Sequence, residues 1–318
     1  MTAATPSRTL TASLVRGALT SPFKRAGRSG ATLTADRLTA GDVRVAPAAL
    51  ASYNRICGFP DAAPPPLTYP HVLGFPLAMR LMTARRFPLP VVGLVHTWIE
   101  ITRHRTAPVT DPLELTVYAD ALTPHRRGTE VTMVTEARSG GQLVWESRSG
   151  YLSRRPTTTI VAPGAPGAPG AVGAVGAVGA PGAVGAPGAV GAVGAVGAVG
   201  AAPATELPAV AEWRLPGDLG RRYGAVSGDR NPIHLYPLTA RLFGFPRAVA
   251  HGMWTVARCL AEADDPGRIR SVRADFKAPV LLPATVTYAA DGSGFRLRSG
   301  SRVHLTGSTT REGEGAHS

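Results

Sequence analysis

Hydrophobic positions divide the chain into two stretches in which a helix precedes several strands. In the first stretch, apolar residues within 69–86 recur at helical spacing, although Pro76 interrupts the run. Apolar runs bounded by turn residues then predict strands at 91–102, 114–121, 130–137 and 143–153. A helix packed on antiparallel strands is typical of an α+β fold.

The second stretch repeats this order. Short helices are predicted at 219–226 and 237–243, followed by a longer helix at 252–263, and the segment between the first two is expected to be a loop. The strands that follow are predicted at 269–276, 281–289, 295–298 and 303–307. The same order of elements therefore appears twice.

Between the two stretches, glycine recurs at every third position from 164 to 200, followed by Ala and, except after the last glycine, by Val or Pro. The period is that of collagen, but Val fills most of the positions where collagen carries imino acids, so a triple helix is disfavoured. Without charges or large side chains the run cannot offset its ordering entropy, which predicts a disordered linker. The expected organisation is a basic segment at 1–35, a domain at 36–160, the linker at 161–203, a domain at 204–310 and a tail at 311–318.

The N-terminal 35 residues carry basic residues and no acidic one, with abundant Ser and Thr, which is the composition of a transit peptide. The alternative, which we favour, is a helix at 10–19 packed on the first domain by its apolar residues. No apolar stretch is long enough to span a membrane. The chain contains two cysteines, Cys57 and Cys259, so we expect no disulfide and a reducing, cytoplasmic location.

The formal net charge is +13, but the basic residues are spread along the chain without dense runs or interleaved aromatic residues. This distribution disfavours nucleic-acid binding. A basic surface suits an anionic carrier equally well, such as the phosphates of coenzyme A or an acidic acyl carrier protein.

The most informative segment is 227–234, Ser-Gly-Asp-Arg-Asn-Pro-Ile-His, together with His251-Gly252 at the head of the predicted long helix. A carboxylate, an amide, an imidazole and a free helix N–H are the groups that move a proton next to a carbonyl. An Asp-x-Asn-Pro segment alone is commonly a turn, because Asp and Asn bond to their own backbone and Pro fixes φ. The whole string is more specific and indicates an active site.

This string, extended back to Tyr223 and followed by Ala-His-Gly-Met at 250–253, resembles the signature of MaoC-like dehydratases, the type 2 (R)-specific enoyl-thioester hydratases. The resemblance is strong over 217–260, weaker over 67–151 and absent from the glycine repeat. It implies two hot-dog repeats, each a long helix wrapped by an antiparallel sheet, with the motif in the second repeat alone. The first repeat would then complete the acyl tunnel.

The resemblance implies that Asp229 and His234 are the catalytic pair and Gly252 the oxyanion donor. Hydration of a 2-enoyl thioester needs an activated water, a proton for the α-carbon and a donor to the enolate oxygen, which these groups could supply. Asn231 and Ser227 would not react themselves but would fix the conformation of the motif loop. The expected substrates are acyl-CoA or acyl-carrier-protein thioesters of fatty-acid metabolism, with no cofactor and no metal; a homodimer is compatible with this.

Other candidates carry weaker signals. His251 and Lys277 could contact substrate, although a satisfied helix-start histidine and a solvated strand-end lysine are the simpler interpretations. A metal site formed by Asp229, His234 and His304 lacks compact spacing, and His71 and His96 are most simply structural. Tyr236 stands where the family often has an acidic residue, so loop packing or substrate preference could differ. The alternative functions are a hot-dog thioesterase and a catalytically silent partner subunit.

Overall fold

The computed structural model describes residues 33, 35–91, 93–154 and 207–313. The predicted helix at 10–19 and the glycine repeat lie outside these residues, so both remain expectations from the sequence.

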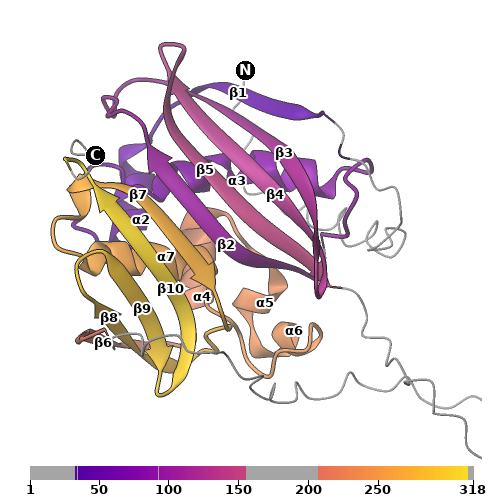
Figure 1. Cartoon of the computed structure of the whole chain (residues 1–318), viewed down its shortest axis with the longest axis vertical. Coiled ribbons are helices and arrows are strands. Elements are labelled where there is room, and N and C mark those ends of the chain that lie inside the picture. The colour runs from indigo at the N-terminus through magenta and orange to yellow at the C-terminus, as the bar shows by residue number, and fades with distance from the viewer. Residues whose placement is uncertain (1–32, 34, 92, 155–206, 314–318) are drawn as a thin grey trace, which may run out of the picture. The chain divides into compact units, whose positions relative to one another are not determined.

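Ten strands form one antiparallel sheet in which each half of the chain contributes five strands in the same order (Figure 1). Across the sheet the order is β1-β3-β4-β5-β2 and then β7-β10-β9-β8-β6, so the second half mirrors the first. The strands of the first half are β1 (Arg37–Val43), β2 (Leu94–Arg103), β3 (Leu113–His125), β4 (Gly128–Ser139) and β5 (Gln142–Arg154). Those of the second half are β6 (Ala209–Leu215), β7 (Ile269–Phe276), β8 (Ala284–Ala290), β9 (Gly294–Ser299) and β10 (Arg302–Arg311).

Helices cover one face of this sheet (Figure 1). The first half supplies α2 (Pro47–Cys57) and α3 (Tyr69–Thr83). The second half supplies α4 (Leu219–Ser227), α5 (Pro232–Leu235), α6 (Pro237–Arg241), α7 (Gly252–Glu262) and the short 3₁₀ helix η2 (Pro266–Arg268). Each half thus runs strand, helices, strand and then a three-stranded meander.

The predicted α+β class and the long strands agree with the structure, but the expected order was incomplete. Each half begins with a strand, β1 or β6, and these form the two outer edges of the sheet. The prediction from sequence missed both, although each carries an alternating signal: Leu38 and Ala40 in β1, and Ala211, Trp213 and Leu215 in β6, are more buried than the residues between them. It also missed α2, although Pro47 at its start and the left-handed Gly58 after its end are helix boundary signals.

Two further expectations about helices were wrong. The segment 227–234 was expected to be a loop throughout, yet it contains α5, which begins at Pro232. Helix α3 was expected to be interrupted by Pro76, yet it continues to Thr83. Proline costs a helix one backbone hydrogen bond, and burial of Val72, Leu77 and Met79 on both sides of it offsets that loss.

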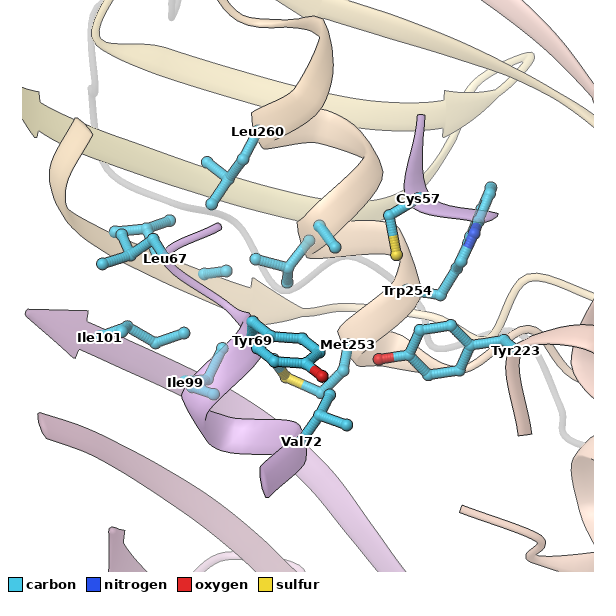
Figure 2. Packing of buried hydrophobic residues seen from close by; sticks show 14 of the residues in the cluster. Cys57, Leu67, Tyr69, Val72, Ile99, Ile101, Tyr223, Met253, Trp254 and Leu260 are labelled. Atoms are coloured by element: carbon cyan, nitrogen blue, oxygen red, sulfur yellow. The ribbon is translucent and has the colours of Figure 1, made fainter. Parts of the chain in front are cut away.

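A single hydrophobic core joins the two halves (Figure 2). Tyr69 of α3 and Met253 of α7 lie in it beside Ile99 of β2, and the indole N–H of Trp254 donates to the carbonyl of Ile56 at 2.9 Å. Strands β2 and β7 also pair directly, with Ile99 opposite Ala274. The two halves therefore pack together as one compact unit.

Candidate active site

The motif segment lies directly on helix α4 because two glycines on that helix leave room for it. A Cβ on Gly220 would lie 2.0 Å from the carbonyl oxygen of His234, and one on Gly224 would lie 2.7 Å from that of Asp229. Helix α4 ends at Gly228, whose φ of 76° is in the left-handed region. The chain can therefore turn back along α4 immediately, which holds Asp229 and His234 against the helix.

Short-range hydrogen bonds fix the conformation of this segment. The Ser227 hydroxyl accepts from the N–H of Asp229 at 3.2 Å, and the Asp229 carboxylate accepts from the N–H of Asn231 at 3.1 Å. The Asn231 side chain accepts from the N–H of Ile233 at 3.3 Å and so caps α5. The side chains of Ser227 and Asn231 thus accept hydrogen bonds from the backbone of this segment.

His234 is held by its backbone surroundings in one tautomer. Its Nδ1 lies 2.7 Å from the carbonyl oxygen of Val249, which can only accept, so Nδ1 carries the proton. Nε2 is then left with its lone pair. Burial lowers the pKa of His234, and the negative charge of Asp229 opposes this only in part. A neutral imidazole whose Nε2 can accept a proton is what a general base requires.

His251 packs flat on His234, with the ring centroids 3.7 Å apart. Its Nε2–H donates to the backbone carbonyl of Asp229 at 2.9 Å, and burial lowers its pKa to about 3. His251 is therefore neutral at physiological pH and holds the backbone of Asp229. From the sequence, His251 could contact substrate or be a structural histidine at the helix start. The hydrogen bond to the Asp229 carbonyl fits the structural interpretation.

The donor atoms of Asp229, His234 and His251 all lie within 4.8 Å of one another. His304, which the sequence placed in a candidate metal set, lies elsewhere, with Nε2 3.0 Å from the hydroxyl of Ser299. In the cluster, His234 Nδ1 and His251 Nε2 are already used for backbone hydrogen bonds. The cluster therefore has the composition of a metal site but also that of a proton-transfer site.

Gly252 is the first residue of α7, and its N–H has no acceptor among the described residues. Helix N-termini carry partial positive charge, so this N–H is suited to a developing negative charge on oxygen. A Cβ at this position would lie 2.8 Å from Cε1 of Phe276. Only glycine therefore leaves space between the helix start and β7.

The first half of the chain extends the wall of this site. Phe276 packs on His96 with ring centroids 4.7 Å apart, and His96 stacks on Tyr151 at 4.5 Å. Burial lowers the pKa of His71 to about 4 against the opposing charge of Asp229, and burial together with that charge raises the pKa of Tyr151. Both side chains thus lie within electrostatic range of Asp229.

Sequence reasoning treated His71 and His96 as structural and did not single out Tyr151. No local signal could have found this group, because β2, β5 and β7 become neighbours only in the folded sheet.

The remaining candidates lie apart from the cluster. Lys277 follows Phe276 at the end of β7, but its side chain is half exposed and its ammonium is 3.9 Å from the Asp275 carboxylate. Tyr236 is exposed, with the Arg221 guanidinium 5.0 Å over its ring. Cys57 and Cys259 are both buried and free, and burial raises the pKa of each thiol.

The sequence of this chain is similar to those of known dehydratases. The family model described as the MaoC like domain matches residues 199–312. The chain is 36% identical over 261 residues to 3-hydroxyacyl-thioester dehydratase X of Mycobacterium tuberculosis, a match that covers 81% of each protein. This chain belongs to the MaoC-like dehydratase family. Membership confirms the enzyme class predicted from the motif, a hydro-lyase.

Solved structures of this family have the same fold. The crystal structure of HtdX of Mycobacterium tuberculosis matches with a TM-score of 0.65 and 31% identity, over 87% of this chain and 100% of that one. A MaoC-like dehydratase from Phytophthora capsici matches with a TM-score of 0.56 over 87% of this chain and 96% of its own, at 16% identity, and shows the fold alone. Among the described residues, no helix is long and apolar enough to cross a membrane.

Proposed function

We propose that this protein is an (R)-specific 2-enoyl-thioester hydratase, equivalently a 3-hydroxyacyl-thioester dehydratase, of fatty-acyl metabolism. One observation carries the proposal: possible donor atoms of Asp229, His234 and His251 lie within 4.8 Å of one another, and the next residue, Gly252, has an N–H without an acceptor among the described residues. This arrangement supports a proton acceptor and an oxyanion donor that act on one substrate.

In the proposed hydration, a water molecule lies between the Asp229 carboxylate and His234 Nε2. As the water oxygen bonds to C3 of the enoyl group, the Asp–His pair takes its proton and the C2–C3 π electrons move towards the thioester carbonyl. The Gly252 N–H and the α7 dipole stabilise the enolate oxygen. The pair then delivers a proton to C2, which restores the carbonyl; dehydration is the same path in reverse.

The nature of the substrate rests on the relatives. The protein of Mycobacterium tuberculosis is named for 3-hydroxyacyl thioesters, and the chain is also 42% identical over 74 residues to the beta subunit of a fatty acid synthase of Aspergillus oryzae. That segment covers 21% of this chain and 4% of the synthase subunit. Both names support an acyl thioester as the substrate class.

The test is a hydration assay with crotonyl-CoA that follows the loss of the conjugated thioester absorbance. Asp229→Asn keeps the shape of the side chain and removes its negative charge, so kcat should fall by about 10²–10⁴-fold. Asp218→Asn, at the start of α4 and outside the cluster, is the matched control and should retain activity.

Three results would contradict the proposal. Unchanged turnover by Asp229→Asn would remove Asp229 from the mechanism. Release of free thiol without hydration would identify a thioesterase. Binding of thioesters without any turnover would identify a silent partner subunit.

A further inference from the structure

Helix α6 and the turn after it expose large apolar side chains beside the motif segment. Tyr236, Leu238, Leu242 and Phe243, together with Arg221 and Arg241, are here called the α6 patch. Leu238 is 73% exposed and Leu242 is 83% exposed. Monomeric proteins rarely gather such residues on the surface without a partner to cover them.

Positive charge accompanies the apolar side chains of the patch. The Arg221 guanidinium lies over the Tyr236 ring, and the Arg241 Nε–H donates to the carbonyl of Pro246 at 3.4 Å. Arg247 lies next to Pro246 and donates to the carbonyl of Pro283 at 3.1 Å. Arg221, Arg241 and Arg247 are all exposed, and two of them belong to the patch itself.

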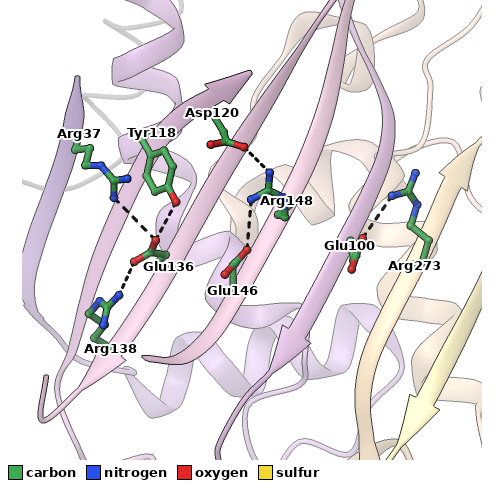
Figure 3. Close-up of polar contacts among 9 residues, drawn as sticks. All are labelled: Arg37, Glu100, Tyr118, Asp120, Glu136, Arg138, Glu146, Arg148 and Arg273. Atoms are coloured by element: carbon green, nitrogen blue, oxygen red, sulfur yellow. Dashed lines mark hydrogen bonds and ion pairs between the residues drawn. The ribbon is translucent and has the colours of Figure 1, made fainter. Parts of the chain in front are cut away.

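These arginines differ from many others in the protein. On the outer face of the sheet, Arg148 pairs with Asp120 and Glu146, and Arg273 pairs with Glu100 (Figure 3). Arg221, Arg241 and Arg247 bond to neutral carbonyls instead, and none of them has an acidic partner among the described residues. Their charge is therefore not neutralised.

The sequence on either side of the patch contains few acidic residues that could neutralise its positive charge. Between Leu219 and Ala261 the sole acidic residue is Asp229, which belongs to the candidate active site. An apolar centre with a charged rim is the composition of a protein interface. A phosphate group alone would need the arginines but would leave Leu238 and Leu242 uncovered.

The patch also lies close to the proposed chemistry. Leu238 is four residues after His234, so its Cα lies within roughly 14 Å of that of His234. The Thr239 hydroxyl donates to the carbonyl of Pro232 at 2.6 Å, which ties α6 to the motif segment. Figure 1 shows α5 and α6 at the margin of the fold, uncovered by the sheet in that view.

We infer that the α6 patch docks an acidic carrier protein whose phosphopantetheine arm delivers the acyl thioester to Asp229 and His234. This inference rests on the proposed function. Leu238 and Leu242 contact an apolar face of the carrier, and the arginines attract its acidic residues. The charge raises the rate of encounter, and the apolar contact sets how long the carrier stays.

The experiment measures binding and turnover separately. Binding of a fluorescently labelled, acidic bacterial acyl carrier protein in its holo form is followed by anisotropy at low and at high salt. Turnover is measured with three crotonyl thioesters, on the same carrier, on CoA and on pantetheine. Wild-type protein should bind the carrier at low salt and lose it at high salt, and kcat/KM should be about tenfold higher for the carrier than for pantetheine.

Two variants target the patch: Leu242→Ser and Arg241→Ala. Each should weaken carrier binding and lower carrier kcat/KM by about fivefold or more, with the pantetheine value unchanged. Arg126→Ala, an exposed arginine on the hairpin between β3 and β4 of the first half, is the charge control and should change neither.

Several results would overturn the inference. The carrier could fail to bind, or the patch variants could bind it as well as wild type does. An equal loss on the CoA thioester in Arg241→Ala would identify a phosphate site instead. Conversion of a dimer to a monomer by Leu242→Ser would identify an interface between copies of this chain. If no thioester is turned over but the carrier still binds through the patch, only the proposed function fails.

Discussion

The two halves of the sheet share one fold but differ in the connection before their long helix. Gly58 follows α2 and Gly228 follows α4, and both glycines adopt left-handed φ angles. From there the first half runs directly to α3, whereas the second half inserts Asp229, α5 and α6 before it reaches α7. The fold therefore offers the same connection twice. The first carries Asp61, which pairs with Arg55 at the surface, whereas the second brings Asp229 and His234 together.

The starts of the two long helices differ in the same way. Tyr69 occupies the first position of α3, where it is buried and packs edge-on against Tyr53 at 5.1 Å. Gly252 occupies the first position of α7 and leaves its N–H without an acceptor among the described residues. The buried Tyr69 side chain at the start of α3 contributes to packing. The start of α7 has no side chain, and its N–H is unbonded within the described part of the chain, which suits it to bind an oxyanion.

The largest contrast should appear between two buried histidines, one from each half. His234→Gln should lower kcat for crotonyl-CoA by about 10²–10⁴-fold, because it removes the proposed base. His71→Gln should lower it by less than about tenfold, because His71 donates to or accepts from Ser147 at 3.3 Å and takes no part in the proposed proton transfer. Equal losses in the two variants would mean that both halves supply chemistry.

A smaller effect is expected from closing the helix start of the second half. Gly252→Ala keeps the N–H but places a Cβ against Phe276, so kcat/KM should fall by about 10–10²-fold. Adding Phe276→Leu should restore part of that loss by making room. Gly217→Ala is the control, since a Cβ there meets nothing closer than 3.9 Å. A Gly252→Ala variant with full activity would show that the gap is not used.

The smallest effect concerns stability at acidic pH, to which both halves contribute. The pKa of His71 is about 4 and that of His251 about 3 in the folded protein, against an ordinary 6.5. Below pH 6.5 the unfolded chain binds protons that the folded protein excludes. The stability present above pH 6.5 is therefore lost as pH falls towards 4, by at most about 1.4 kcal/mol per pH unit for each histidine.

Urea unfolding at pH 7, 6 and 5 measures this loss. His71→Gln should flatten the dependence, whereas His104→Gln, at an exposed position, serves as the control. An unchanged slope in His71→Gln would contradict the assigned effect of burial.

Local sequence patterns were sufficient for many of the elements. Alternating apolar residues located β7 at its observed bounds and the centres of β2 to β5, because both faces of these strands have distinct surroundings. The edge strands β1 and β6 also alternate, but each is only seven residues long and mixes small or charged residues with its apolar ones, which weakens the signal. The motif predicted that Asp229, His234 and Gly252 form the site; possible donor atoms of Asp229 and His234 lie within 4.8 Å of each other, and Gly252 follows His251 of the same cluster.

The sequence alone determined the repeated order of elements, the family and the residues of the motif, since each of these depends on nearby positions in the chain. Only the tertiary structure decided which tautomer His234 adopts and that His251 holds the Asp229 backbone. It also decided that β2 pairs with β7, which brings His96 and Tyr151 to Phe276. These contacts depend on burial and on partners distant in sequence, and no local pattern encodes them.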